Sequence, residues 1–503
     1  MSQTAAAPDA VSLGKSGAQA EEAGPRHRWW ILAVIGLAQL MVVLDATIVN
    51  IALPSAQAGL GFSDGNRTWI VTAYSLAFGS LLLLGGRIAD LFGRKPAFLV
   101  GVGGFAAASA VAGAAVNFEM LVAGRALQGL FGALLAPAAL SLLTTTFTNP
   151  KERAKAFGVY GAIAGSGAAV GLLLGGVLTE YMNWRWTLYV NLFIAAFALV
   201  GGAMLLKSTA RDRNSKLDLP GTALVTTGLF SIVYGFSNAE SHDWSSPMSW
   251  GFLTVGAALL TAFTWWQTRA PHPLLPLRVL LDRNRGASFI AMLISSAGMF
   301  GVFLFLTYYL QLSLGYSAVE TGLAFLPMVG ALMVSATMST SFLIPRFGPK
   351  IVVPLGMVLG AVGLVWLTAL DMDSTYAAHI LGPLLFAGLG IGLIMAPGMS
   401  LATSGVAPED SGVASASVNT MQQIGGSIGT ALLNTLAASA ATAYLVGKDP
   451  ANKLNQAQAA LESYSTAYWW SAGFFAAGAL TTVLLYRRGV PAVDADAAPT
   501  VHM

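Results

Sequence analysis

Apolar segments about 20 residues long follow one another along the whole chain, and short polar stretches separate them. A helix needs about 20 apolar residues to cross the ~30 Å hydrocarbon core of a bilayer. The pattern therefore predicts an all-α membrane protein with fourteen transmembrane helices. The seventh and thirteenth segments are the weakest, because they are rich in Gly, Ser, Thr and Asn. The fourteen segments are centred near residues 40, 79, 106, 131, 165, 196, 228, 258, 297, 333, 361, 390, 424 and 477.

Composition agrees with this pattern and excludes several classes of protein. Hydrophobic residues make up 55% of the chain and charged residues 10%, against about 25% charged in a typical soluble protein. The absence of cysteine excludes disulfides and thiolate metal sites. No GxxxxGK[ST] phosphate-binding loop occurs, which argues against an ATP-driven pump. Nothing indicates an enzyme or a channel pore, and no cofactor or metal is expected.

The distribution of Lys and Arg predicts the orientation in the membrane. If both termini are cytoplasmic, the inside loops hold about five times as many basic residues as the outside loops, which agrees with the positive-inside rule. The outside loops then carry only Arg67, Arg185, Lys448 and Lys453. Lipid topology thus accounts for the net charge of +3 without a nucleic-acid partner. The first 28 residues lack the apolar core of a signal peptide, so a multi-pass protein of the plasma (inner) membrane is expected.

A short repeat divides the chain into two related halves. GRIADLFGRKP (Gly86–Pro96) joins the second and third segments, and LIPRFGPKI (Leu343–Ile351) joins the tenth and eleventh. Duplicated halves with a substrate site between them are a recurrent plan among transporters. The predicted parts are a cytoplasmic tail (1–28), a six-helix half (29–206), a linker with two inserted helices (207–285), a second six-helix half (286–488) and a cytoplasmic tail (489–503).

Two ionisable residues, Asp45 and Arg125, lie inside apolar, membrane-length segments. A charge at the bilayer centre costs from ~2.5 to more than 10 kcal/mol, so such residues usually line a polar pathway or pair with each other. Two alternatives remain at this point. The residues could form a static structural ion pair, or Arg125 could extend its guanidinium to the membrane surface.

Four motifs together resemble the major facilitator superfamily, and in particular its fourteen-span drug:proton antiporters. They are LDATIVNIALP (Leu44–Pro54), GRIADLFGRKP, RALQG (Arg125–Gly129) and GAIAGSGAAVGLLLGG (Gly161–Gly176). The resemblance covers essentially the whole chain. It implies a monomeric exporter that exchanges external protons for hydrophobic or amphiphilic drugs or antibiotics. The alternatives within the same fold are an exporter of a lipid, siderophore or other amphiphile, and a proton-coupled uptake carrier.

The GRIADLFGRKP loop is a candidate conformational latch. Gly86 and Gly93 permit a close helix approach and a tight turn, and Asp90 can accept hydrogen bonds at the start of a neighbouring helix. Arg94 and Lys95 hold the loop in the cytosol. The resemblance favours a latch that depends on the conformational state, and the alternative is a basic loop that only directs topology.

In the family that this chain resembles, the residue at the position of Arg125 is associated with proton transfer, which implies a proton-coupling pair of Asp45 and Arg125. Burial disfavours the charged form of a carboxyl group, whereas a neighbouring cation favours it. Such opposing effects are what a proton carrier requires. The coupling hypothesis therefore needs Arg125 to lie close to Asp45.

The fifth segment resembles the glycine-rich antiporter helix of the family, with small residues at a four-residue spacing that favours close helix packing. The family usually has proline at the positions of Leu172 and Phe193. Loss of proline removes a helix bend, so a straighter fifth helix is expected, and the tightness of coupling depends on the rigidity of this helix. The helix-packing glycines are Gly161, Gly165, Gly171, Gly175 and Gly176.

Polar residues in other segments are candidates for a substrate cavity, and interhelical hydrogen bonding is the alternative for each of them. The tenth segment has no acidic residue except Glu320 at its outer edge, which argues against a divalent-cation drug site. The main candidates are Asn50, Tyr74, Gln128, Asn419, Gln422 and Gln423. Tyr234, Ser295, Ser296 and Tyr308 are further candidates.

Overall fold

The computed structural model describes residues 25–489, apart from residues 63, 208–216, 243 and 450. Most of the predicted tails and of the charged part of the linker lies outside this range, but residues 25–28, predicted as tail, form the first turn of the first helix, α1 (Pro25–Leu60). Within the described range, every regular element is a helix. Thirteen helices are long and apolar enough to cross a membrane, and a bent helix brings the number to 14. These helices include all the predicted spans.

The first eight spans are α1 to α8, and they are joined by short connections. Their bounds are α1 Pro25–Leu60, α2 Asp64–Phe92, α3 Arg94–Gly113, α4 Phe118–Thr146, α5 Pro150–Tyr181, α6 Trp186–Leu205, α7 Leu219–His242 and α8 Pro247–Gln267.

The second half begins after a short helix in the connector, and π-helical turns extend or precede three of its spans. The elements are α9 Leu277–Leu281, α10 Arg283–Tyr308, α11 Ala318–Met338, α12 Ile344–Phe347, α13 Pro349–Leu367, α14 Leu381–Ala402, α15 Ser411–Leu445 and α16 Lys453–Leu485. The π-helical turns are Tyr309–Ser313, Ser339–Leu343 and Tyr376–Ile380.

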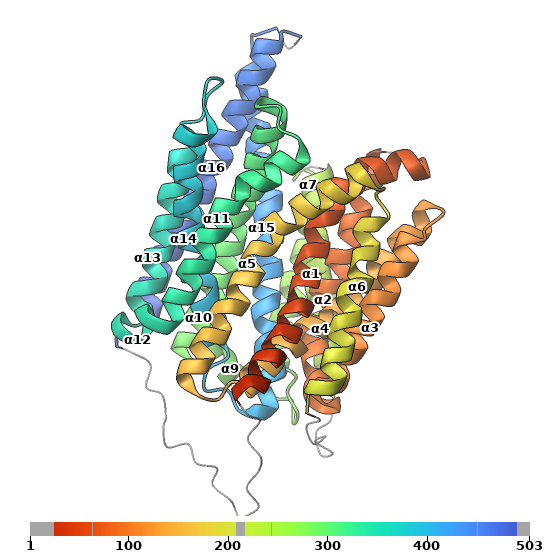
Figure 1. Cartoon of the computed structure of the whole chain (residues 1–503), viewed down its shortest axis with the longest axis vertical. Coiled ribbons are helices and arrows are strands. Elements are labelled where there is room, and N and C mark those ends of the chain that lie inside the picture. The colour runs from red at the N-terminus through yellow and green to blue at the C-terminus, as the bar shows by residue number, and fades with distance from the viewer. Residues whose placement is uncertain (1–24, 63, 208–216, 243, 450, 490–503) are drawn as a thin grey trace, which may run out of the picture.

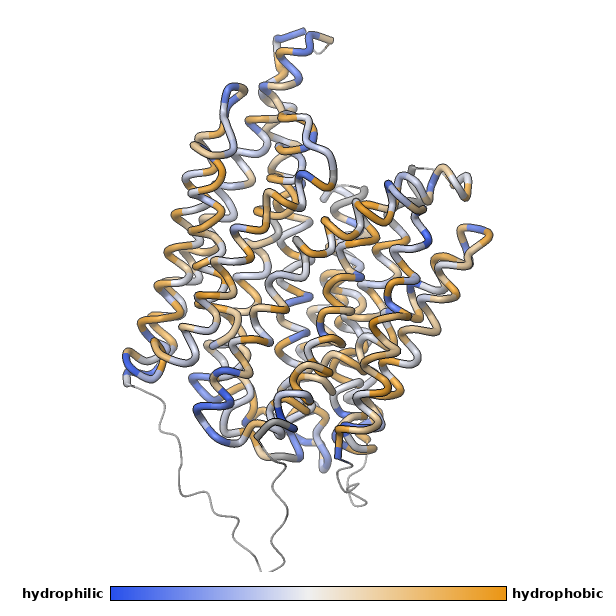
Figure 2. The backbone as a smooth tube through the Cα atoms, viewed as in Figure 1, coloured by the Kyte–Doolittle hydropathy of each residue, from blue (hydrophilic) through white to orange (hydrophobic). Residues whose placement is uncertain are grey.

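Apart from α7 and α8, the spans form two groups, α1 to α6 and α10 to α16, that lie side by side (Figure 1). The second span of each half packs against the fifth span of the other, so α2 contacts α15 and α11 contacts α5. The inserted α7 and α8 pack against each other, and α7 also contacts α2 and α15. The apolar residues follow the spans, whereas polar residues gather at the ends of the bundle (Figure 2). The end that holds the α2–α3 loop is called the latch end below.

Polar residues at the segment ends explain where several spans begin. The side chain of Asn117 accepts a hydrogen bond from the Met120 amide at the start of α4. α11 begins with a capping box, in which Ser317 and Glu320 bind each other's backbone amides. Such caps satisfy amides at a helix start that have no partner within the helix.

The repeat seen in the sequence has a common backbone geometry. Gly93 between α2 and α3 has φ 100°, and Gly348 between α12 and α13 has φ 75°. Only glycine adopts such positive φ values without strain, which explains the Phe-Gly pair in both loops. When the loops are aligned on this pair, Pro345 occupies the place of Asp90.

The glycine-rich α5 bends by 45° between Pro150–Gly167 and Val170–Tyr181. The expectation of a straighter helix without proline at position 172 is therefore wrong. On both sides of the bend, α5 lies against α1 and against the second half. A Cβ on Gly161 would lie 2.7 Å from that of Ala396 in α14. Beyond the bend, a Cβ on Gly175 would lie 3.2 Å from the Ile48 carbonyl in α1.

Other glycines of α5 also lie against neighbouring helices. Gly165 approaches Leu332 of α11 before the bend, and Gly171 approaches Thr47 of α1 beyond it. Gly176 is buried, as is Leu172. Phe193 in α6 is exposed on the outer surface of the bundle. The glycines thus allow α5 to touch both halves.

Gly161→Leu is expected to separate α5 from α14 and to lower the thermal midpoint of the detergent-solubilised protein. Its Cβ would lie only 2.8 Å from the Ala396 Cα, and overpacking of this kind typically costs about 1–3 kcal/mol. Gly330→Leu in α11 is the matched control, because a Cβ there meets nothing within 4 Å. Equal midpoints for the two variants would contradict the close packing of α5.

Candidate functional site

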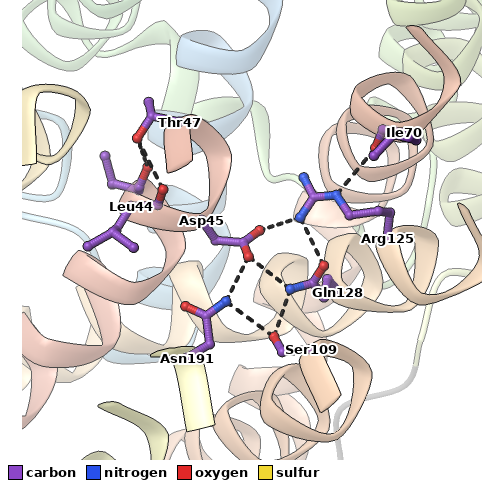
Figure 3. A network of polar contacts seen from close by, with 9 residues as sticks. Leu44, Asp45, Thr47, Ile70, Ser109, Arg125, Gln128 and Asn191 are labelled. Atoms are coloured by element: carbon purple, nitrogen blue, oxygen red, sulfur yellow. Dashed lines mark hydrogen bonds and ion pairs between the residues drawn. The ribbon is translucent and has the colours of Figure 1, made fainter. Parts of the chain in front are cut away.

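Asp45 in α1 and Arg125 in α4 form an ion pair inside the first half (Figure 3). Arg125 Nη1 lies 2.5 Å from Asp45 Oδ2, and the side chains are 1% and 0% exposed, respectively. A buried charge without a partner would be strongly destabilising. The two charges flagged in the sequence therefore compensate each other. The alternative of an arginine that extends to the membrane surface is wrong.

The second oxygen of Asp45 is held by two amide side chains. Asp45 Oδ1 accepts hydrogen bonds from Gln128 Nε2 at 2.9 Å and from Asn191 Nδ2 at 2.7 Å. Both amides also donate to Ser109 Oγ, at 2.7 Å and 3.3 Å. The carboxylate is thus surrounded by donors from α4 and α6, with α3 behind them (Figure 3).

Arg125 has several partners besides Asp45. Its Nη1 donates to Gln128 Oε1 at 2.8 Å, and its Nε donates to the Ile70 carbonyl of α2 at 3.3 Å. The guanidinium carbon also lies 4.4 Å from the centre of the Tyr74 ring, a cation–π arrangement. Five helices of the first half therefore meet at one polar centre.

Sequence reasoning missed Ser109, Asn191 and the Ile70 carbonyl. Asn191 could have been predicted from the sequence, because a side-chain amide inside an apolar span needs a hydrogen-bond partner. Ser109 could not, since a serine in a helix often bonds its own backbone. Two buried atoms of the centre, Tyr74 Oη and Asn191 Oδ1, have no hydrogen-bond partner among the described residues. They leave one donor and one acceptor free beside the ion pair.

This arrangement can respond to a proton. Protonation of Asp45 would remove the negative charge that faces Arg125, and the arginine would then be a buried cation held only by neutral groups. Because such a cation is costly, the charge of Arg125 depends on the charged form of Asp45 for its compensation. No group of three or more His, Cys, Asp or Glu residues is placed to hold a metal ion in the described part of the chain.

The predicted latch joins the two halves. Asp90 at the end of α2 accepts hydrogen bonds from the Gly412 amide at 2.9 Å and the Val413 amide at 3.2 Å, at the start of α15. Arg94 Nη2 donates to Ser411 Oγ at 2.7 Å and lies 3.8 Å from Asp90 Oδ1. A loop that served only as a topology signal does not account for these contacts.

The glycines of the loop permit this approach. A Cβ on Gly86 would lie 2.6 Å from the Gly412 carbonyl, which no side chain tolerates. Lys95 has a different role from Asp90 and Arg94, because its Nζ donates to the Ala203 and Leu206 carbonyls at 2.8 and 2.7 Å. Lys95 therefore fastens α3 to the end of α6 within the first half.

The candidate cavity residues have diverse surroundings. Tyr74 and Gln128 belong to the Asp45 centre. Asn419 Nδ2 donates to the Ser415 carbonyl of its own helix at 3.0 Å, and Gln422 Nε2 donates to Met395 Sδ at 3.4 Å. Gln423 is half-buried. The side chain of Asn50 lies outside the described part.

The further candidates are equally dispersed. Tyr234 packs in an aromatic cluster with its ring centre 4.5 Å from that of Phe252. Ser295 is buried and donates to the Met292 carbonyl of its own helix. Ser296 is half-buried and Tyr308 is exposed.

Comparisons with known proteins identify the relatives of the chain. A family model described as Major Facilitator Superfamily matches residues 35–430. The puromycin resistance protein pur8 of Streptomyces alboniger is 46% identical over 498 residues, which cover 98% of each protein. The cephamycin export protein CmcT of Amycolatopsis lactamdurans is 38% identical, over 80% of this chain and 83% of that protein. The tetracenomycin C resistance and export protein of Streptomyces glaucescens is 35% identical, over 83% and 77%.

A solved structure has the same overall architecture. The crystal structure of the human organic anion transporter MFSD10 (TETRAN) matches with a TM-score of 0.61 and covers 90% of this chain and 99% of that one. The sequence identity is 16%, so this likeness concerns the fold alone.

Proposed function

Because the chain belongs to the major facilitator superfamily, it is a multi-pass membrane transporter and not an enzyme, and we propose that it exports a drug in exchange for protons. The expected substrate is a hydrophobic or amphiphilic antibiotic. The relatives named for puromycin, cephamycin and tetracenomycin C support export. The observation that carries the coupling is the buried Asp45–Arg125 pair, held by hydrogen bonds within one half.

The proton gradient is the energy source in this proposal, and no cofactor is needed. A proton that reaches Asp45 from outside neutralises the carboxylate and leaves Arg125 with neutral partners. The bundle then favours the conformation in which Asp45 releases the proton to the cytoplasm. Drug moves outward in the opposite half of the cycle. In this proposal the proton and the drug bind different conformations, and each shifts the population toward the conformation it prefers.

The proposed substrate cavity lies next to the coupling centre and includes Asn50, Tyr74, Gln128, Asn419, Gln422 and Gln423. The free Tyr74 hydroxyl and the free Asn191 carbonyl oxygen support a polar contact with substrate beside the ion pair. A drug bound there would sense the charge on Asp45 directly.

We place the protein in the plasma membrane as a monomer, with both termini in the cytoplasm. The latch end is then the cytoplasmic end, and the Asp90–Gly412 contact closes the pathway on that side. The halves comprise residues 29–206 and 286–488, with 207–285 as linker and insert and with tails at 1–28 and 489–503.

The alternatives use the same fold and differ in cargo or direction. A lipid, siderophore or other amphiphile could replace the antibiotic, or a substrate could be taken up together with protons. The relative that is 46% identical over 98% of both proteins favours antibiotic export. Loss of dye from preloaded cells separates export from uptake.

Cells that express the protein should expel a preloaded hydrophobic dye or puromycin faster than cells without it, and a protonophore should abolish the difference. One proton that crosses 100 mV supplies about 2.3 kcal/mol, and each tenfold gradient requires about 1.4 kcal/mol. One proton could thus sustain a gradient of roughly fortyfold for a neutral compound. Efflux that continued unchanged after collapse of the proton gradient would refute the coupling.

A further inference from the structure

The start of α15 is capped by a residue from the other half of the protein and not by the residue that precedes the helix. The side chain of the residue before a helix normally accepts hydrogen bonds from the amides of the second and third helical residues. For α15 the preceding residue is Asp410, and the two amides belong to Gly412 and Val413. Asp90, from the other half of the protein, takes both. Asp410 makes no capping hydrogen bond.

Asp410 is held away from these amides by an arginine. Its Oδ2 accepts a hydrogen bond from Arg278 Nη2 at 2.7 Å. The Asp410 side chain is 5% exposed, whereas that of Arg278 is 68% exposed. An ion pair with one exposed partner is weakly stabilising. Arg278 can therefore be displaced by a small change around it.

The corresponding helix of the first half shows the ordinary cap. Asn149 precedes α5 and accepts from the amides of Lys151 and Glu152 at 3.0 and 3.3 Å. No carboxylate competes there, because Pro345 stands at the place of Asp90 in the second half. The two halves thus differ in one respect, since α5 caps itself and α15 is capped from across the interface.

Arg278 belongs to the connector that returns from the inserted helices. The connector is fastened to α8, since Gln267 Oε1 accepts from the Leu275 amide at 2.9 Å. It is also fastened to α10, since Arg285 Nη2 donates to the Arg278 carbonyl at 3.0 Å. The insert therefore presents Arg278 to Asp410, the residue that directly precedes α15.

We propose that Asp410 replaces Asp90 as the cap of α15 when the two halves separate at the latch end, and that Arg278 controls this exchange. With the halves in contact, Arg278 holds Asp410 and leaves the two amides to Asp90. When Asp90 withdraws, the amides lose their acceptors, and Asp410, two and three residues before them, turns to them. The backbone of Asp410, at φ −102° and ψ 2°, then rotates toward the extended form that Asn149 already has.

The exchange predicts that two variants of Asp410 change the population of the separated state in opposite directions. Asp410→Asn loses the ion pair but keeps a good cap, so the separated state is expected to gain population. Asp410→Ala removes the replacement cap, so that state is expected to lose population. Arg278→Gln frees Asp410 and should resemble Asp410→Asn. One cap corresponds to a change of about fivefold in the ratio of the two states.

The test measures the distance between the halves at the latch end. The natural chain has no cysteine, so spin labels at Lys151→Cys in α5 and Ser404→Cys after α14 are the only ones present; both positions are exposed. Pulsed electron paramagnetic resonance on the purified full chain gives the populations of the joined and separated states without substrate or gradient. Its result is therefore independent of whether the proposed efflux is correct.

The expected result is more of the long distance for Arg278→Gln and Asp410→Asn, and less for Asp410→Ala. Arg278→Gln combined with Asp410→Ala should match Asp410→Ala alone, because Arg278 acts through Asp410. Arg269→Gln is the control, since it removes a charge from the same connector and Arg269 contacts the Trp265 ring. Equal distributions for all variants, or a shift of Asp410→Ala and Asp410→Asn in the same direction, would overturn the proposal. If the Arg278–Asp410 ion pair had only a structural role, Asp410→Ala and Asp410→Asn would shift the distances in the same direction.

Discussion

Cells that carry Asp45→Asn should lose uphill drug efflux completely and match cells without the protein. Asparagine retains the size of the side chain but cannot carry the proton. One of its two terminal atoms becomes a donor, and it then faces a donor in either orientation, because Arg125 approaches one oxygen and Gln128 and Asn191 the other. Efflux of puromycin against a gradient, at matched protein abundance, measures the effect.

The same substitution should also lower stability, because Arg125 keeps its charge without a counter-ion. Removal of one partner from a buried pair typically costs about 3–5 kcal/mol. Asp45→Asn combined with Arg125→Gln removes both charges and should restore abundance and thermal midpoint in large part. It should not restore efflux. The pair would be a structural feature alone if the double variant transported drug uphill.

A control for the charge change is Asp373→Asn. Asp373 is exposed in the loop after α13, so loss of its charge should leave efflux and stability unchanged. Uphill transport by Asp45→Asn itself, dependent on the gradient, would show that another group carries the proton.

Asp90→Asn is expected to insert normally and to transport at least tenfold more slowly. The basic residues that direct topology remain. Asparagine offers one acceptor oxygen where Asp90 uses two for the Gly412 and Val413 amides, and it loses the charge that favours a helix start. Hydrogen bonds to charged groups contribute about 1.5–3 kcal/mol each, so the balance between the two conformations should shift by an order of magnitude or more.

Initial rates of efflux and the distance between the labels at positions 151 and 404 test this prediction together. The rate should fall and the long distance should become more populated. Glu119→Gln is the control, because Glu119 is an exposed acid in the first turn of α4. Normal kinetics for a fully expressed Asp90→Asn protein would reduce the loop to a topology signal.

The sequence determined the spans and identified the charges that matter. Hydropathy is a local property, and a bilayer requires about 20 apolar residues wherever a helix crosses it, so all the spans could be predicted. Asp45 and Arg125 stood out for the same reason, since a charge inside an apolar run needs a partner. Gly93 likewise predicted a tight turn in GRIADLFGRKP, because a positive φ favours glycine wherever it occurs, and the repeat in the second half has the same turn at Gly348.

The identity of the partners was decided by the tertiary structure. Ser109 and Asn191 reach Asp45 only because α3 and α6 pack beside α1 and α4. Leu172 suggested a straight α5, but the helix bends by 45° without proline at that position.

The cap of α15 shows most clearly what local sequence cannot predict. Local sequence assigns it to Asp410, the residue that precedes the helix. Contact between the halves assigns it to Asp90, which lies 322 residues away from Gly412 along the chain. Local preferences are set by neighbouring residues, whereas the choice between two competing acceptors depends on which of them the packed halves bring within reach.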